Sequence, residues 1–207
     1  MEIKERIISG KLKPDSSLIE ENFASDLQIS RTPLREALQR LEIEDLVVRQ
    51  PNGRLKVAPI SQQEVQELFT VRSLLEGLVV RSAALEATSA DLEVLSNILE
   101  QIKRAAEQGD EEDILEYGSQ FHSQLYKLSR NKTAVKLLGS LNDHINRYRR
   151  LVSRFETGRD GKAYMEHKKI LDSLKDRDPD KAEQAMKEHI LNSLHSVVDK
   201  INQYEKS

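Results

Sequence analysis

The spacing of apolar positions along the chain changes near residue 60. Before that point, apolar residues fall into short groups separated by proline and glycine, which predicts several short elements. Beyond it, they recur every three or four positions almost to the end, which predicts long amphipathic helices and no strands. We therefore expect two domains, over residues 1–60 and 61–207.

Three short helices followed by a hairpin are predicted within the first domain. KERIISG predicts a helix that stops at Gly10, and SSLIEENFASDL predicts one that begins with a capping box formed by Ser17 and Glu20. SRTPLREALQRL predicts the third helix, with Ser30 as its N-cap. The segments LVVRQ and RLKV flank PNG, a strong hairpin signal. This order of elements is typical of a winged helix-turn-helix.

The second domain is predicted to be a bundle of about six helices, so the fold class is mostly α: a winged helix-turn-helix followed by an all-α bundle. Capping residues, early prolines and terminal glycines set the expected boundaries. These helices run from Ser61 to about Leu85, Thr88 or Ser89 to Gly109, Asp110 to Ser129, Lys132 to Glu156 before Gly158, Lys162 to Leu174, and Pro179 to Tyr204.

Composition narrows the class of protein further. Charged residues make up 32% of the chain, and no apolar run approaches the ~20 residues that span a bilayer. The first residues do not resemble a signal peptide, so we expect a cytoplasmic protein without a membrane partner. The absence of cysteine excludes disulfides and thiolate metal sites. A net charge of −3 gives no support to nucleic-acid binding by bulk charge, so a local motif must provide it.

SRTPLREALQRL contains the side chains best suited to read DNA. Arg31, Thr32 and Arg35 lie at the N-terminal end and on the polar face of the expected recognition helix, where arginine can bind guanine and threonine can reach phosphate. Gly53 would let the tip of the wing approach the minor groove, and Arg54 would add charge there. Each feature alone also fits a solvated surface, but their ordered combination favours DNA binding.

The chain resembles a family of bacterial regulators over nearly its whole length. IISGKLKP…SLIEENFASDLQISRTPLREALQRLEIEDLVVRQPNGRLKV resembles the DNA-binding domain of GntR-type regulators. VQELFTVRSLLEGLVVRSAAL resembles the entry helix of the FadR-like subfamily, which carries a helical FCD effector domain. The resemblance implies that Arg31, Thr32, Arg35 and Gly53 contact operator DNA.

Two positions depart from the family pattern in predicted turns. Asp15 and Asp45 stand where glycine is usual. Aspartate tolerates turn geometry, so we expect both turns to be retained.

Three of the five histidines fall on separate predicted helices, each beside apolar neighbours: His122, His167 and His189. Such positions face a bundle interior, where imidazoles can converge on a divalent metal. For any one of them alone, a hydrogen-bonded core histidine is the alternative. His144 and His195 are expected not to be ligands.

The resemblance adds a ligand pattern to these histidines. Metal-binding FCD domains carry an aspartate four residues before the first histidine, and two later histidines spaced as His167 and His189 are. Here Gly118 occupies the aspartate position, which implies a three-His site with at least one open coordination position and weakened metal affinity. Zn²⁺ or Ni²⁺ suits such a site. Arg72 and Arg147 match family positions that face the cavity, so the resemblance implies that they bind an effector carboxylate.

These features predict a homodimeric transcriptional regulator, in the family usually a repressor. It would bind a palindromic operator in double-stranded DNA and respond to a small organic acid, which shifts the spacing of the two wings. One alternative is a DNA-binding protein whose bundle only dimerises, with structural histidines. The other is a metal-dependent hydrolase, which lacks an HExxH or comparable motif and would leave the first domain unexplained.

Overall fold

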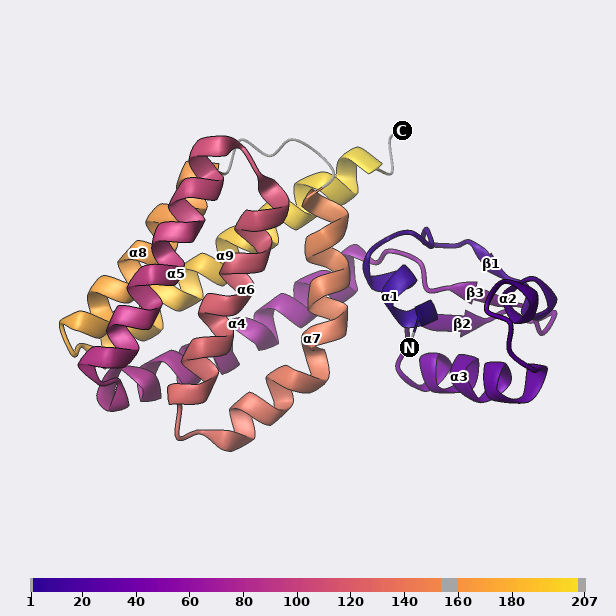
Figure 1. Ribbon diagram of the computed structural model, residues 1–207, viewed down its shortest axis with the longest axis horizontal. Coiled ribbons are helices and arrows are strands. Elements are labelled where there is room, and N and C mark those ends of the chain that lie inside the picture. Colours follow the sequence, from indigo (N-terminus) through magenta and orange to yellow (C-terminus); the bar gives the residue numbers. More distant parts are fainter. Residues whose placement is uncertain (1, 154–159, 205–207) are drawn as a thin grey trace. The chain divides into compact units, whose positions relative to one another are not determined.

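The computed structural model describes residues 2–153 and 160–204, and these form two compact units (Figure 1). The first unit consists of residues 1–61 together with 146–151, apart from the undescribed Met1. The second consists of Gln62–Ile145 and the described residues from Val152 onwards. The fold class expected from the sequence, a winged helix-turn-helix followed by a helical bundle, is confirmed.

Three helices and a three-stranded antiparallel sheet make up most of the first unit (Figure 1). Its elements are α1 (Glu2–Ile8), β1 (Ser17–Leu18), α2 (Glu20–Asp26), α3 (Arg31–Ile43), β2 (Val47–Arg49) and β3 (Leu55–Val57). The strand order is β1-β3-β2, and in the hairpin Val48 pairs with Lys56. Apolar side chains from all three helices and the sheet form one core, which fixes α3 by its buried face: Leu34, Leu38 and Leu41.

The expected capping box of Ser17 and Glu20 is wrong. Ser17 lies in β1, where it pairs with Lys56, and α2 instead has Ile19 as its N-cap, without a side-chain hydrogen bond. Ser17 lies two residues before that N-cap, because α2 begins only at Glu20, so the serine hydroxyl is not in the N-cap position. Ser30 is the N-cap of α3, but its side chain makes no cap hydrogen bond either.

Both aspartates that replace the family glycines adopt left-handed backbone conformations. The φ angle is 62° at Asp15 and 55° at Asp45. Aspartate is among the residues that visit this region most often, and the turns are retained as expected.

Within the described part of the chain, six long helices form the second unit, with the last turns of α7 assigned to the first. They are α4 (Gln62–Glu86), α5 (Ser89–Gln108), α6 (Glu111–Leu128), α7 (Lys132–Ser153), α8 (Asp160–Lys175) and α9 (Pro179–Tyr204). Thr88 and Asp91 form a reciprocal capping box at the start of α5, and Gly109 ends that helix with a φ of 69°. The expected stop at Gly158 lies outside the described residues.

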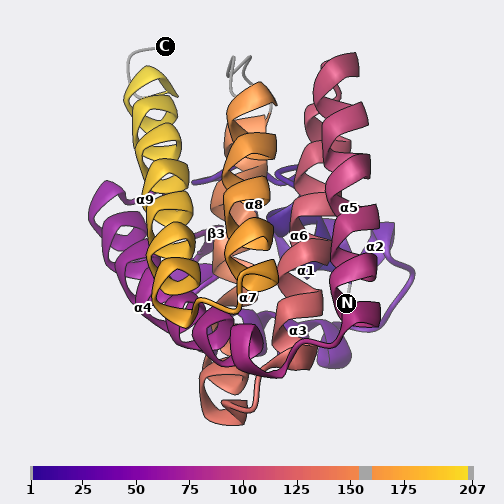
Figure 2. The same cartoon turned by 90° about the vertical axis from the view of Figure 1, so that its left-hand side faces the viewer.

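Within the bundle, α8 packs against both α5 and α9, and α9 packs along α4 (Figure 2). The two long helices α4 and α9 approach closely at Gly77, where an added Cβ would lie 3.0 Å from Cε of Lys187. Among the described residues of the bundle, α4, α6, α8 and α9 contribute a group of buried polar side chains: Arg72, Glu76, His122, His167 and His189. Among the described helices, none is both long and apolar enough to cross a membrane.

Candidate DNA-binding surface and metal centre

The exposed face of α3 carries the arginines expected to read DNA. Arg31 and Arg35 are both exposed, and each is paired with a glutamate of the preceding helix α2. Nη2 of Arg31 lies 2.9 Å from Glu21 Oε1, and Nε of Arg35 lies 2.8 Å from Glu20 Oε2. Thr32 is exposed beside them. If Arg31 and Arg35 bind DNA, as the sequence predicts, they must exchange these carboxylate partners for phosphates or bases.

The wing is a tight hairpin whose tip is held by local hydrogen bonds. The N–H of Gly53 donates to the Gln50 carbonyl at 2.8 Å, and Gly53 has a φ of 78°, which favours glycine. Arg54 is exposed, and its backbone N–H donates to Asn52 Oδ1. Arg49, which the sequence did not single out, donates to Glu42 and to the Gly53 carbonyl and so ties the wing to α3.

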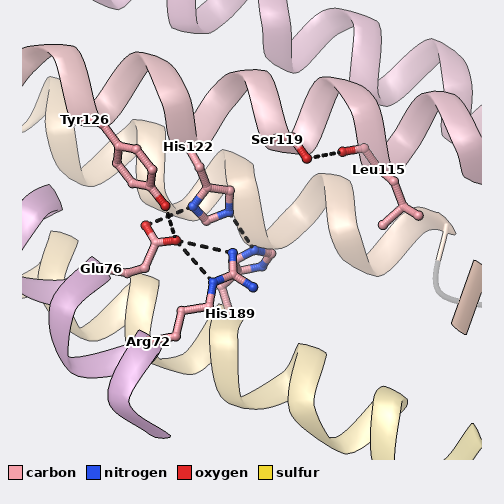
Figure 3. Close-up of polar contacts among 7 residues, drawn as sticks. All are labelled: Arg72, Glu76, Leu115, Ser119, His122, Tyr126 and His189. Carbon is pink, nitrogen blue, oxygen red and sulfur yellow. Dashed lines mark hydrogen bonds and ion pairs between the residues drawn. The ribbon is translucent and has the colours of Figure 1, made fainter. Parts of the chain in front are cut away.

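His122, His167 and His189 meet inside the bundle. They come from α6, α8 and α9, and all three are buried. One nitrogen from each lies within 4.8 Å of the other two, and Nε2 of His122 lies 3.3 Å from Nε2 of His189 (Figure 3). Two nitrogens bound to one tetrahedral ion at about 2.0–2.1 Å would be separated by about 3.3 Å. The structure thus brings together the three histidines singled out by sequence.

The outer nitrogen of each imidazole faces an oxygen acceptor. Nδ1 of His122 lies 3.0 Å from Glu76 Oε2, and Nδ1 of His189 lies 2.8 Å from Glu166 Oε2. Nδ1 of His167 lies 2.8 Å from the carbonyl oxygen of Ala163. A carboxylate or carbonyl only accepts, so each Nδ1 must carry the hydrogen. Each Nε2 of the neutral ring then keeps its lone pair, as a metal ligand requires.

This tautomer makes the short distance between His122 and His189 informative. Two lone pairs that face each other across 3.3 Å repel, and a shared cation or proton makes the arrangement favourable. Burial lowers the pKa of the His189 imidazole to about 4, although the Glu166 carboxylate opposes this effect. His189 is therefore neutral near pH 7. The donor set suits Zn²⁺ or another imidazole-binding ion.

A buried carboxylate on α4 joins the histidine cluster to an arginine (Figure 3). Glu76 is fully buried; its Oε1 accepts from Tyr126 Oη at 2.7 Å and from Arg72 at 3.2 Å. Burial alone would raise the pKa of Glu76, but the facing imidazole of His122, with Arg72 and Tyr126, lowers it to about 2. Glu76 is thus ionised, and Arg72 is held as its counter-charge inside the bundle.

Three members of this network were not predicted from the sequence: Glu76, Tyr126 and Glu166. The first two had a signal, because Glu76 lies four residues after Arg72 and Tyr126 four residues after His122, each on one helical face. Glu166 had none, because it precedes His167 directly and reaches the cluster from a neighbouring face of α8.

Four further residues considered in the sequence analysis lie outside this hydrogen-bonded network. Gly118 is buried on α6, one turn before His122. Arg147 belongs to the first unit, where its guanidinium donates to the carbonyls of Ala58 and Pro59; its role in effector binding stays a prediction. Nδ1 of His144 lies 3.3 Å from Glu64 Oε1. His195 lies on α9, on the exposed surface.

A winged helix-turn-helix with an arginine-bearing recognition helix, joined to a helical bundle, defines a two-domain DNA-binding regulator. The family model described as "Bacterial regulatory proteins, gntR family" matches residues 1–57, and the FCD domain model matches residues 67–192. The chain belongs to the GntR family of bacterial transcriptional regulators, in the group that carries an FCD domain. It is a regulator and not an enzyme, which removes the hydrolase alternative.

Relatives with curated names agree with this membership. The HTH-type transcriptional regulator YdhC of Bacillus subtilis is 28% identical over 92% of this chain and 83% of its own length. McbR of Escherichia coli is 31% identical over 68% of this chain and 63% of its own length. The transcriptional repressor RspR of Escherichia coli is 26% identical over 94% of this chain and 85% of its own length.

Solved structures support the fold. Escherichia coli McbR/YncC superposes with a TM-score of 0.78 at 24% identity, covering 98% of this chain and 95% of that one. A structure described as a metal-free FCD domain gives a TM-score of 0.59 at 17% identity, covering 71% of this chain and all of that one.

Proposed function

We propose that this regulator is a homodimeric repressor whose bundle binds a divalent metal and a small organic acid. The observation that carries the proposal is the convergence of His122, His167 and His189, each with its Nδ1 turned to an acceptor. A ligand set of three neutral imidazoles leaves coordination positions open for an exogenous oxygen ligand. When bound, the metal supplies a positive charge that attracts an anion.

Arg72 is the second anchor for the effector in this proposal. It is buried, and Glu76 holds its guanidinium beside His122 and close enough for its charge to act on His189. A carboxylate bound to the metal could take a charge-assisted hydrogen bond from this arginine. The proposed effector site therefore consists of the three histidines and Arg72, while Gly118, one turn before His122, offers no ligand atom.

Operator binding in this proposal involves Arg31, Thr32 and Arg35 of α3, with Gly53 and Arg54 at the wing. We also propose that the DNA-binding domain ends at residue 60 and the effector domain begins at residue 61. The regulator is proposed to act in the cytoplasm. Two wings in one dimer read two half-sites of a palindrome, and effector binding favours a dimer arrangement with another wing spacing. Repression is supported by the similarity to RspR of Escherichia coli, a transcriptional repressor.

An apolar stripe on α4 supports dimerisation. Val71, Leu74, Leu78 and Leu85 are all exposed, at spacings that place them along one side of the helix. Such a stripe is typical of a surface that another protein covers, and two-fold dimers bury the same stripe on both subunits. Leu74→Glu should yield monomers in analytical ultracentrifugation, whereas Glu93→Gln, on the exposed surface of α5, should leave the dimer intact.

The test combines metal analysis, thermal unfolding and DNA binding. One equivalent of Zn²⁺ or Ni²⁺ per chain should raise the melting temperature, and selected carboxylates should raise it further only with metal present. The same carboxylates should release the protein from DNA selected out of a random pool. A protein that binds this DNA but neither metal nor carboxylate would contradict the sensor function and leave a bundle that only dimerises.

A further inference from the structure

Gly118 offers no ligand atom beside His122, yet two carboxylates lie against the outer nitrogens of the histidine cluster. Glu76 on α4 faces His122 on α6, and Glu166 on α8 faces His189 on α9. Both contacts run between helices, so neither follows from local helix geometry. His167, by contrast, is held by the carbonyl of its own helix four residues earlier.

We propose that Glu76 and Glu166 are positioning residues for the metal site. Without contacting the metal, they provide the negative charge that an aspartate at position 118 would supply. The proposal rests on the three-His site proposed above. A carboxylate that accepts a hydrogen bond from Nδ1–H fixes the tautomer and the orientation of the ring. It also makes Nε2 a more basic ligand for the metal. Removing such a partner typically weakens metal binding on the order of 10–100-fold.

The two carboxylates differ in what else they hold. Glu166 Oε1 accepts from Asn192 Nδ2 at 3.0 Å, so both of its oxygens contact α9 near His189. Glu76 holds His122 with one oxygen and Arg72 and Tyr126 with the other. Glu76 thus links the metal ligand to the proposed effector anchor, while Glu166 acts on the metal ligand from the partly exposed side.

Glu166 gives the sharper test, because its side chain is 16% exposed and Glu76 is fully buried. Glu166→Gln keeps an oxygen that can accept from Nδ1–H but removes the charge, whereas Glu166→Ala removes both. Glu188→Gln is the matched control: it lies beside His189 in sequence but pairs with Lys169 at 2.6 Å. Zn²⁺ affinity would be measured on the full-length protein by competition with a chromophoric chelator.

We expect Glu166→Gln to weaken Zn²⁺ binding about ten-fold, Glu166→Ala by more, and Glu188→Gln not at all. The absorption bands of Co²⁺-loaded protein should shift in both Glu166 variants. In the metal-free Glu166→Ala protein, the ¹⁵N signals of the His189 ring should show loss of the Nδ1–H tautomer. Glu76→Gln should weaken Zn²⁺ binding similarly. Thermal unfolding of the metal-free Glu166 variants would check that they fold.

Two different failures can be told apart. If the wild-type protein binds no Zn²⁺, the proposed metal site fails and the positioning role fails with it. If the wild type binds one equivalent and Glu166→Gln and Glu166→Ala bind it equally well with unchanged Co²⁺ spectra, only the positioning role is overturned.

Discussion

Nε2 of His122 and Nε2 of His189 lie 3.3 Å apart, although the two residues belong to α6 and α9 and are separated by 67 positions in the sequence. Each ring is turned by a carboxylate on its far side, Glu76 for one and Glu166 for the other. The bundle thus aims two buried imidazoles at one point, with His167 at the third corner. Core histidines that only fill space have no need to share a point, so this arrangement favours a ligand site.

Replacing His189 should weaken metal binding strongly, while replacing His195 should leave it unchanged. His189→Gln removes one of three nitrogens, and we expect Zn²⁺ affinity to fall at least 100-fold, about 3 kcal/mol. His195→Gln, on the same helix but on the exposed surface, is the matched control. Isothermal titration calorimetry would measure both. Equal Zn²⁺ affinity in the two variants would indicate that the three histidines are hydrogen-bonded core residues and not metal ligands.

The sequence predicted the three histidines but not the network that orients them. Periodicity places His122, His167 and His189 on the inner faces of separate helices, and the resemblance supplied their grouping. Glu76 and Glu166 act across helix pairs, and such contacts depend on how helices pack, which a single sequence does not show.

The ends of several helices could be predicted from the residues that stand at them. Thr88, Gly109 and Pro179 mark helix ends through their own side chains or backbone, and the structure agrees at each. The Ser17 capping box is absent because Ser17 pairs with the distant Lys56 in the sheet and α2 begins only at Glu20, beyond the reach of the serine hydroxyl. Local signals therefore located elements well, and failed where a distant segment competed for the same residue.

Gly118→Asp should tighten metal binding. Gly118 is buried on α6 one turn before His122, and residues four apart on a helix share a face, so an aspartate there would add an anionic ligand. We expect Zn²⁺ affinity to rise on the order of ten-fold, about 1.4 kcal/mol. Gly118→Ala controls for the loss of glycine. Unchanged affinity in the aspartate variant would argue that His122 is a core histidine.

Thr88→Ala should destabilise the bundle without affecting metal binding. The Thr88 hydroxyl accepts from the Asp91 N–H at 3.3 Å, and the Asp91 carboxylate accepts from the Thr88 N–H at 2.9 Å. Loss of such a cap costs about 1 kcal/mol, a fall in melting temperature of about 2–4 °C for a chain of this size. Thr88→Ser keeps the oxygen and should unfold near the wild-type temperature. Calorimetry of the metal-free protein would decide.

The glutamates of α2 should restrain DNA binding by the arginines of α3. Glu20 Oε2 lies 2.8 Å from Nε of Arg35, so DNA must displace this carboxylate before Arg35 can reach a base. Both side chains are at the surface, where such a pair contributes only about 0–1 kcal/mol. Glu20→Gln should therefore raise affinity for DNA selected by the wild type, but by no more than about five-fold.

Arg35→Ala should act in the opposite direction and more strongly, because a bidentate arginine–guanine contact is worth about 1–3 kcal/mol of discrimination. Fluorescence anisotropy at several salt concentrations would separate the effects: a lost phosphate contact reduces the salt dependence for all sequences, whereas a lost base contact relaxes the preference at one base pair.

Glu112→Gln, which removes the same charge from α6 in the other unit, should leave DNA affinity unchanged. If Glu20→Gln behaves like Glu112→Gln while Arg35→Ala loses affinity, Arg35 reads DNA without being restrained by α2. If Arg35→Ala binds as the wild type does, α3 does not contact the operator through Arg35, and the pair with Glu20 is only a surface ion pair.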